Sequence, residues 1–341
     1  VDYHANQLNV TYLNGKKEPM TVTFNVSNND VAFRYTFDGL KAQHIIINEE
    51  KTAFNLPKIS TSFLSPQSNP LIGFARTKPS YEEDYKPDAP LTAKSGYGRG
   101  YTFPCLFKVG GEGWVLVSET GTHGNYPGCH ISDYDANKGY QIALPMKEEG
   151  DGIGSNNAVF SLPGSTPWRT ITVGKDLKPL VETTIPYDVV EPRYEASQKY
   201  GVGKYAWSWL IWQDASCNYN DQKQFIDLAA TMGYEYVLVD ALWDTQIGRD
   251  KIAELSRYAQ GKGVSLMLWY NSNGITNDAP QGPRNCMDNI VARKKEMAWM
   301  KSIGVKGIKV DFFGSDKQQT MQNYEDILSD ANDYGIQVIF H

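Results

Sequence analysis

The chain has 341 residues, of which 41% are hydrophobic and 21% are charged, and these values are ordinary for a globular protein with a sizeable core. Its net charge of −6, without any basic block, argues against a nucleic-acid partner. No apolar run approaches the length of a membrane span, so we expect no membrane-spanning segment. We expect the protein to be a monomer or a small homo-oligomer.

Residues 1–185 are predicted to form an all-β sandwich. They consist of short alternating runs separated by turn residues, such as "MTVTFNVSNNDVAFRYTF" and "WRTITVG". No signal peptide is visible, and the sequence reads as though it begins inside this domain, so we expect the N-terminal part of the domain to be missing. Residues 186–203 hold Pro186, Pro192 and two late glycines, and we interpret them as a linker.

From residue 204 the pattern changes to strands that alternate with helices. The strand-like runs are "KYAWSWLIW", "GYEYVLVDALW", "GVSLMLWYN", "GIKVDFF" and "GIQVIFH". A repeated strand–helix unit predicts a parallel sheet. Polar and aromatic residues follow all five strands and no phosphate-binding glycine motif is present, which favours a (β/α)8 TIM-type barrel over a nucleotide-binding sheet. We therefore expect residues 204–341 to be a catalytic barrel truncated after its fifth strand.

The fourth of these strands carries a lysine and an aspartate where a parallel sheet is usually apolar. Lys309 and Asp311 are two residues apart, so they lie on the same face of the strand. A buried ion pair gives little net stability, which makes a purely structural role a weak explanation. A carboxylate kept ionised by a neighbouring cation suits the nucleophile of a retaining glycosidase. Asp240 at the tip of the second strand strengthens this interpretation.

These motifs together resemble a known family. "GIKVDFF" resembles the Lys-x-Asp nucleophile motif of the α-galactosidase clan, and "VLVDALW" resembles that clan's segment in which an aspartate binds sugar hydroxyls. With the N-terminal β domain, "WSWLIWQD", "VKGIKVDFFGSD" and "VIFH", the chain resembles glycoside hydrolase family 97 more specifically. Retaining members of that family, including α-galactosidases, carry an aspartate at the position of Asp311, whereas inverting α-glucosidases lack it.

The resemblance implies a retaining, exo-acting α-galactosidase that hydrolyses oligosaccharides with a terminal α-linked galactose by double displacement. Asp311 would be the nucleophile, Lys309 and Asp240 would hold the sugar, and His341 matches a sugar-binding histidine at the tip of strand five. The acid/base would be a glutamate of a later strand, beyond residue 341. We expect a bacterial protein that is periplasmic or secreted.

The resemblance also implies one calcium ion near the sugar. Glu119, in "GWVLVSETGTHGNYPG", is the best match to the ligand that the β domain supplies. The remaining ligands would lie beyond residue 341. Without the resemblance, Glu119 reads as a solvated loop carboxylate.

Three tryptophans near the strand tips, Trp209, Trp243 and Trp269, are candidates for a wall on which the sugar stacks. Each could equally pack beneath the mouth of the barrel, because the direction of the side chain decides and the sequence does not fix it. Asp214 we interpret as a cap of the following helix.

Other functions stay open at this point. A non-hydrolytic carbohydrate-binding protein on a decayed barrel would need neither Lys309 nor Asp311, so the presence of both argues against it. An aldolase-type barrel with Lys309 as the Schiff base is disfavoured, because a neighbouring aspartate keeps the lysine charged. Within the family, an α-glucosidase is the alternative, since the choice of sugar depends on contacts to the 4-hydroxyl.

Overall fold

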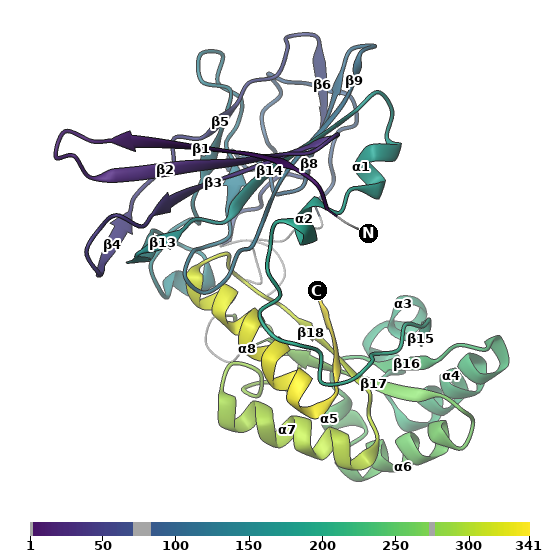
Figure 1. Ribbon diagram of the computed structural model, residues 1–341. Helices are drawn as coiled ribbons and strands as arrows, with labels where there is room; N and C mark the ends of the chain where they lie inside the picture. The colour runs from purple at the N-terminus through teal and green to yellow at the C-terminus, as the bar shows by residue number, and fades with distance from the viewer. Residues whose placement is uncertain (1–2, 71–82, 273–276) are drawn as a thin grey trace. The chain divides into compact units, whose positions relative to one another are not determined.

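The structure is a computed structural model that describes residues 3–70, 83–272 and 277–341 (Figure 1). The described residues divide into two compact units. The β unit comprises residues 3–70, 83–193 and 314–322, and the α/β unit comprises residues 194–272, 277–313 and 323–341. No helix in the described ranges has both the length and the apolar character that a membrane crossing requires.

The β unit is built from antiparallel strands in three sheets. The largest sheet has the order β1-β2-β3-β14-β9-β8-β6-β7, with β13 paired to β3, and the smaller sheets have the orders β10-β11-β5 and β12-β4. The strands are β1 (Asn6–Leu13), β2 (Pro19–Val26), β3 (Asp30–Phe37), β4 (Gln43–Ile47), β5 (Ala53–Phe54), β6 (Ser60–Phe63), β7 (Ala89–Pro90), β8 (Cys105–Val109), β9 (Gly113–Thr120), β10 (His130–Ile131), β11 (Tyr140–Ala143), β12 (Ala158–Leu162), β13 (Gly164–Ser165) and β14 (Trp168–Gly174).

One hydrophobic core joins the sheets of the β unit. Phe107 of the large sheet packs in the same buried cluster as Ile131, Tyr140 and Phe160 of the smaller sheets. The alternating pattern of the sequence therefore forms a layered β structure with an apolar interior. The short helices of this unit are η2 (Gly150–Gly152), α1 (Lys178–Glu182) and α2 (Ile185–Asp188).

The α/β unit contains five parallel strands that pair in chain order. They are β15 (Tyr205–Trp207), β16 (Tyr236–Val239), β17 (Ser265–Asn271), β18 (Gly307–Asp311) and β19 (Gln337–Phe340). Its helices are α3 (Trp209–Trp212), η3 (Gln213–Ser216), α4 (Tyr219–Met232), α5 (Trp243–Gln246), α6 (Arg249–Gln260), α7 (Ile290–Ile303) and α8 (Gln318–Tyr334). The first residues of α8, up to Gln322, are assigned to the β unit. The apolar faces of strands and helices share one core, which includes Val237, Leu266 and Ile308.

Glycines end the helices of this unit and lead into the next strand. Gly233 and Gly304 follow α4 and α7 with φ angles of 67° and 84°, in the left-handed region that glycine adopts without a steric penalty. At the other end of these helices, Asn218 and Asn289 accept backbone N–H groups as N-caps. The first strand is shorter than the sequence suggests, because the chain turns at Ser208 into α3.

Residues 314–322 group with the β unit although the neighbouring residues belong to the α/β unit. The buried ammonium of Lys317 donates to the backbone carbonyl oxygens of Lys147, Glu149 and Ile153 at 2.9, 2.8 and 3.1 Å. The Glu149 carboxylate accepts the N–H of Asp316 at 2.8 Å. These contacts bind the segment that follows β18 to the β unit, which periodicity in the sequence does not reveal.

Candidate active site

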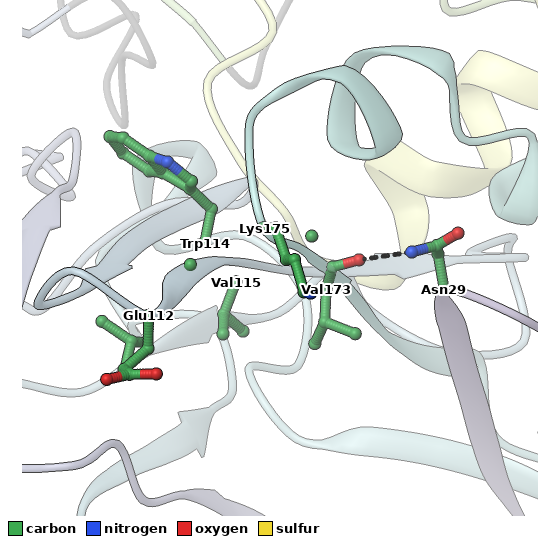
Figure 2. Close-up of a pocket in the computed structure, with 9 residues that line it drawn as sticks. Asn29, Glu112, Trp114, Val115, Val173 and Lys175 are labelled. Carbon is green, nitrogen blue, oxygen red and sulfur yellow. Dashed lines mark hydrogen bonds between the residues drawn. The ribbon is translucent and has the colours of Figure 1, made fainter.

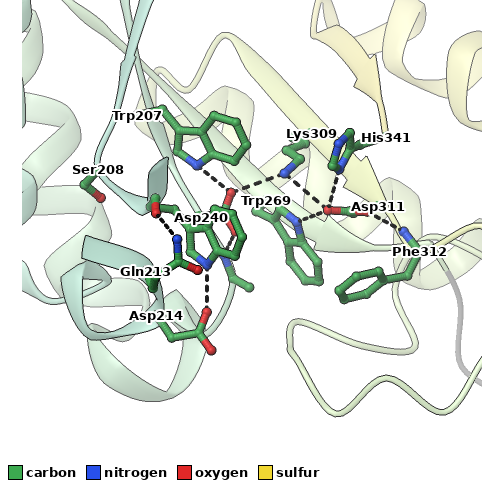
Figure 3. A network of polar contacts seen from close by, with 12 residues as sticks. Trp207, Ser208, Gln213, Asp214, Asp240, Trp269, Lys309, Asp311, Phe312 and His341 are labelled. Carbon is green, nitrogen blue, oxygen red and sulfur yellow. Dashed lines mark hydrogen bonds and ion pairs between the residues drawn. The ribbon is translucent and has the colours of Figure 1, made fainter. Parts of the chain in front are cut away.

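A polar cluster lies where β16, β18 and β19 end (Figure 3). Asp240 follows β16, Lys309 and Asp311 belong to β18, and His341 follows β19. Since the strands are parallel, their carboxyl ends meet at one edge of the sheet, which is where ligands bind in such sheets. The structure thus brings these four predicted residues together.

The ammonium of Lys309 lies between two carboxylates. Its Nζ atom is 3.4 Å from Oδ2 of Asp240 and 3.2 Å from Oδ2 of Asp311. The three side chains are only 5–10% exposed. Lys309 also lies over the ring of Trp207, 4.3 Å from its centroid. Removal from water strengthens these electrostatic interactions, so one cation and two anions are strongly coupled here.

Asp311 accepts hydrogen bonds on both carboxylate oxygens. Oδ2 accepts from the indole Nε1 of Trp269 at 2.9 Å and lies 3.2 Å from Nδ1 of His341, and Oδ1 accepts the N–H of Phe312 at 2.7 Å. Burial by itself raises the pKa of Asp311, but the hydrogen bond from His341, the charge of Lys309 and the indole N–H outweigh it and lower the pKa to about 2. Asp311 is therefore ionised throughout the neutral range.

Asp240 has the opposite tendency. Burial raises its pKa, and the opposing effects of the Lys309 charge and of hydrogen bonds from Ala241 and Trp207 do not cancel that rise. The indole Nε1 of Trp207 donates to Oδ2 of Asp240 at 2.7 Å. Two carboxyl groups on one ammonium are thus shifted in opposite directions, which is how neighbouring carboxyls acquire different chemical roles.

The three candidate tryptophans have different environments. Trp243 and Trp269 are 0% and 1% exposed, and Nε1 of Trp243 donates to the backbone oxygen of Trp269 at 2.8 Å. A fully buried indole offers no face to a sugar, so the structure places both residues beneath the site and not in a stacking wall. Trp209 is half-buried, stacks on Trp207 with ring centroids 5.8 Å apart, and stays available as a wall residue.

Two features of the site escaped the sequence interpretation. Trp207 contacts Lys309 and Asp240, and its only sequence signal was its place in "WSWLIWQD", one of the segments that carry the resemblance. Asp214 accepts Nε1 of Trp209 at 2.8 Å, while Asn218 is the residue that caps α4, so the expectation that Asp214 is a helix cap is wrong.

Models of one protein family match both units. Residues 1–192 match the model described as Glycosyl-hydrolase 97 N-terminal, and residues 200–341 match the model described as Glycoside hydrolase 97. The chain belongs to glycoside hydrolase family 97. The resemblance seen in the sequence is thereby confirmed.

Several known proteins are similar to this family 97 chain. A probable retaining alpha-galactosidase of Streptomyces bingchenggensis is 28% identical over 93% of the chain and 46% of the relative. A retaining alpha-galactosidase of Bacteroides thetaiotaomicron is 27% identical over 94% of the chain and 50% of the relative. The crystal structure of a beta-arabinopyranosidase is 56% identical, with a TM-score of 0.97, over all of the chain and 55% of that protein. The chain therefore spans about half the length of these relatives.

Glu119 of this family 97 chain lies in β9, in the β unit, and both of its oxygens have partners. Oε1 accepts the N–H of Cys129 at 2.7 Å, and Oε2 pairs with Arg169, which also binds Glu50. Burial raises the pKa of Glu119 to about 7 although Arg169 lies beside it.

These surroundings do not fit a calcium ion as they stand. Calcium needs six to eight oxygen ligands, whereas both oxygens of Glu119 are already engaged, one of them by a cation. The described ranges contain no group of three or more His, Cys, Asp or Glu side chains that could hold a metal.

A hollow of about 350 Å³ lies at one end of the large sheet of the β unit (Figure 2). It is lined by residues that include Asn29, Glu112, Trp114 and Lys175, and Nδ2 of Asn29 donates to the backbone oxygen of Val173 at 2.9 Å. The hollow contains a single carboxylate and none of the residues that the sequence singled out. The cluster around Asp311 is therefore the better candidate for catalysis.

Proposed function

We propose that this chain carries the nucleophile of a retaining exo-glycosidase that acts on pyranosides of the α-D-galacto and β-L-arabino configuration. The observation that carries the proposal is the environment of Asp311, a buried carboxylate that His341, Lys309 and Trp269 hold in its ionised form. We further propose that the five parallel strands of the α/β unit are part of a (β/α)8 barrel.

The proposed mechanism is a double displacement. An oxygen of Asp311 attacks the anomeric carbon, the bond to the leaving oxygen breaks, and a covalent glycosyl ester forms. Water then attacks the same carbon and releases the sugar with its original anomeric configuration. Protonation of the leaving oxygen and activation of the water are assigned to the glutamate that the family resemblance implies. In this proposal Lys309 counters the charge of Asp311 before attack, and Lys309 and Asp240 hold sugar hydroxyls.

The proposed substrate class rests on two kinds of relative. Two relatives at 27–28% identity are named as retaining alpha-galactosidases, and the relative of known structure at 56% identity is a beta-arabinopyranosidase. The two substrates are stereochemically akin, since β-L-arabinopyranose has the ring configuration of α-D-galactopyranose without the hydroxymethyl group. The higher identity favours the arabinopyranoside, and the α-galactoside is the second candidate.

Comparison of aryl glycosides tests this proposal. We expect the full-length protein to hydrolyse p-nitrophenyl β-L-arabinopyranoside with the highest kcat/KM. A pocket shaped for a sugar without the hydroxymethyl group should accept the α-D-galactopyranoside less well, by about 10- to 200-fold. Release of the retained anomer first, seen by proton NMR, is expected on both substrates.

Each other outcome of this comparison has a definite meaning. A preference for the α-D-glucopyranoside would contradict the proposed substrate class. First release of the inverted anomer would contradict the double displacement. Binding of sugars without turnover of any of the three glycosides would favour a non-hydrolytic carbohydrate-binding protein.

Calcium dependence is a separate proposal that rests on the family resemblance. Chelation is expected to lower turnover of the aryl glycoside, and added calcium to restore it better than magnesium, because calcium accepts more oxygen ligands in a flexible geometry. The measurement is the initial rate before chelation, after chelation and after each addition. Full activity after exhaustive chelation would remove the proposal and leave Glu119 with a structural role, as the partner of Arg169 and of the Cys129 N–H.

A further inference from the structure

Trp269 contacts the proposed nucleophile from the neighbouring strand. It lies in β17, next to β18 in the sheet, and its backbone is in register with Lys309. Its indole Nε1 donates to Oδ2 of Asp311 at 2.9 Å, and the side chain is fully buried (Figure 3). A hydrogen bond from a buried donor to a buried carboxylate is charge-assisted and therefore strong.

The core fixes the position of this donor. The backbone oxygen of Trp269 accepts Nε1 of Trp243 at 2.8 Å, and its ring meets the ring of Phe312 edge-on, with centroids 5.4 Å apart. The bond from Trp243 fixes the backbone of Trp269, and rotation of the indole away from Asp311 would break the ring contact with Phe312 and open a cavity in a close-packed interior. The N–H is consequently aimed at the carboxylate before any substrate binds.

The other carboxylate oxygen is held by the backbone of Phe312. Its N–H donates to Oδ1 of Asp311 at 2.7 Å, and its φ angle of 66° is in the left-handed region that a bulky residue rarely adopts. Such a conformation persists where its surroundings hold it. The Phe312 carbonyl oxygen accepts from Oγ of Ser272 at 2.9 Å and from Nδ2 of Asn277 at 2.8 Å. Both of these residues come after β17, the strand of Trp269.

Trp269 differs from the titratable side chains around Asp311 because it carries no charge in any protonation state. Lys309 and His341 also lie within 3.2 Å of Oδ2, and Asp240 faces Asp311 across the lysine. The hydrogen bond from His341 depends on its tautomer and protonation. The indole N–H is a donor in every protonation state of the site.

We propose that Trp269 is a positioning residue that, together with the Phe312 N–H, clamps the carboxylate of Asp311 in one rotamer for attack on the anomeric carbon. This inference rests on the proposed function, in which Asp311 is the nucleophile. Trp269 does not touch the sugar. It acts through Asp311, by fixing the carboxylate and by stabilising its ionised form.

The substitution Trp269→Phe tests the clamp, with Trp299→Phe as the matched control. Trp299 belongs to α7 and packs against the core that includes Val237, Leu266 and Ile308, where its ring stacks on that of Trp243 with centroids 5.7 Å apart. We expect Trp269→Phe to lower kcat on the aryl arabinopyranoside by about 10- to 100-fold, as one charge-assisted hydrogen bond is lost. The acidic limb of its kcat/KM profile should move to higher pH, because the ionised form of Asp311 loses a donor. Trp299→Phe should lower Tm and leave kcat and the acidic limb unchanged.

A second replacement keeps the test valid if phenylalanine disturbs the core. Replacement of Trp269 by 3-benzothienylalanine retains the two fused rings and removes only the N–H, so Tm should stay near the wild-type value. We expect kcat to fall and the acidic limb of the kcat/KM profile to move to higher pH, as in Trp269→Phe. Normal kcat and an unmoved acidic limb in this variant would overturn the clamp. The same holds if Trp269→Phe and Trp299→Phe have equal effects on kcat.

Failure of the clamp is distinguishable from failure of the proposed function. If Asp311→Gly retains near-normal turnover, Asp311 is not the nucleophile and the proposed function fails. If Asp311→Gly is inactive and azide rescues it, but removal of the Trp269 N–H changes nothing, only the clamp fails.

Discussion

Asp311→Gly is expected to abolish hydrolysis, and azide to restore part of the activity. Loss of a nucleophile that forms a covalent intermediate should lower kcat by a factor on the order of 10⁴. Glycine leaves an open space at the tip of β18, and a small anion can occupy that space and attack the anomeric carbon from the same side. The glycosyl azide formed in this way should have the inverted anomeric configuration, because only one displacement takes place.

The matched control is Asp311→Asn. Asparagine fills the same space without a nucleophilic carboxylate, so this variant should be inactive and azide should not rescue it. Both variants should retain a cooperative thermal transition. The measurements are the initial rate with and without azide, the anomeric configuration of the product by proton NMR, and Tm. Near-normal turnover by either variant, or a rescued product of retained configuration, would assign the nucleophile to another residue.

The sequence was sufficient to predict the centre of this site, for a geometric reason. Residues two apart in a strand lie on one face, which put Lys309 beside Asp311, and parallel strands put Asp240 at the same edge of the sheet. Glycine after a helical pattern is typical of a helix end, and left-handed glycines do follow α4, α7 and α8 directly, at Gly233, Gly304 and Gly335, whereas α6 ends at Gln260, ahead of Gly263. These inferences needed only local periodicity.

The parts that could not be predicted depend on partners that are distant in sequence. Arg169 is directly opposite Glu119 in the antiparallel pair of β14 and β9, but that register is not evident from either strand alone. Trp243 lies in α5, where its burial depends on how the helix packs, and the indole of Trp269 is buried with its N–H donating to Asp311. Aromatic side chains suit both a core and a binding wall, so residue type alone does not separate the two.

Lys309→Met is expected to impair both catalysis and stability. Methionine has a similar length and fills the space, but the buried carboxylates of Asp240 and Asp311 lose their shared cation. Breaking a buried ion pair by removing one partner costs about 3–5 kcal/mol of unfolding free energy at neutral pH. The ammonium also helps to keep Asp311 ionised, and we propose that it contacts the sugar. We therefore expect kcat/KM to fall by about 10²- to 10³-fold, the scale for the loss of one preorganised donor.

The dependence of this stability loss on pH identifies its cause. Without Lys309, the folded-state pKa values of Asp240 and Asp311 should rise above their unfolded values, because burial then acts with less opposition. The folded variant would bind more protons than the unfolded chain, so its stability should fall as pH rises from about 4 to the new folded pKa values. The Tm difference between wild type and Lys309→Met should therefore be larger at pH 8 than at pH 5. Lys309→Arg keeps the cation and should largely abolish this pH dependence. A Tm difference for Lys309→Met that stays constant across this range would show that Lys309 stabilises the fold by packing, and the electrostatic account of Asp311 would have to be replaced.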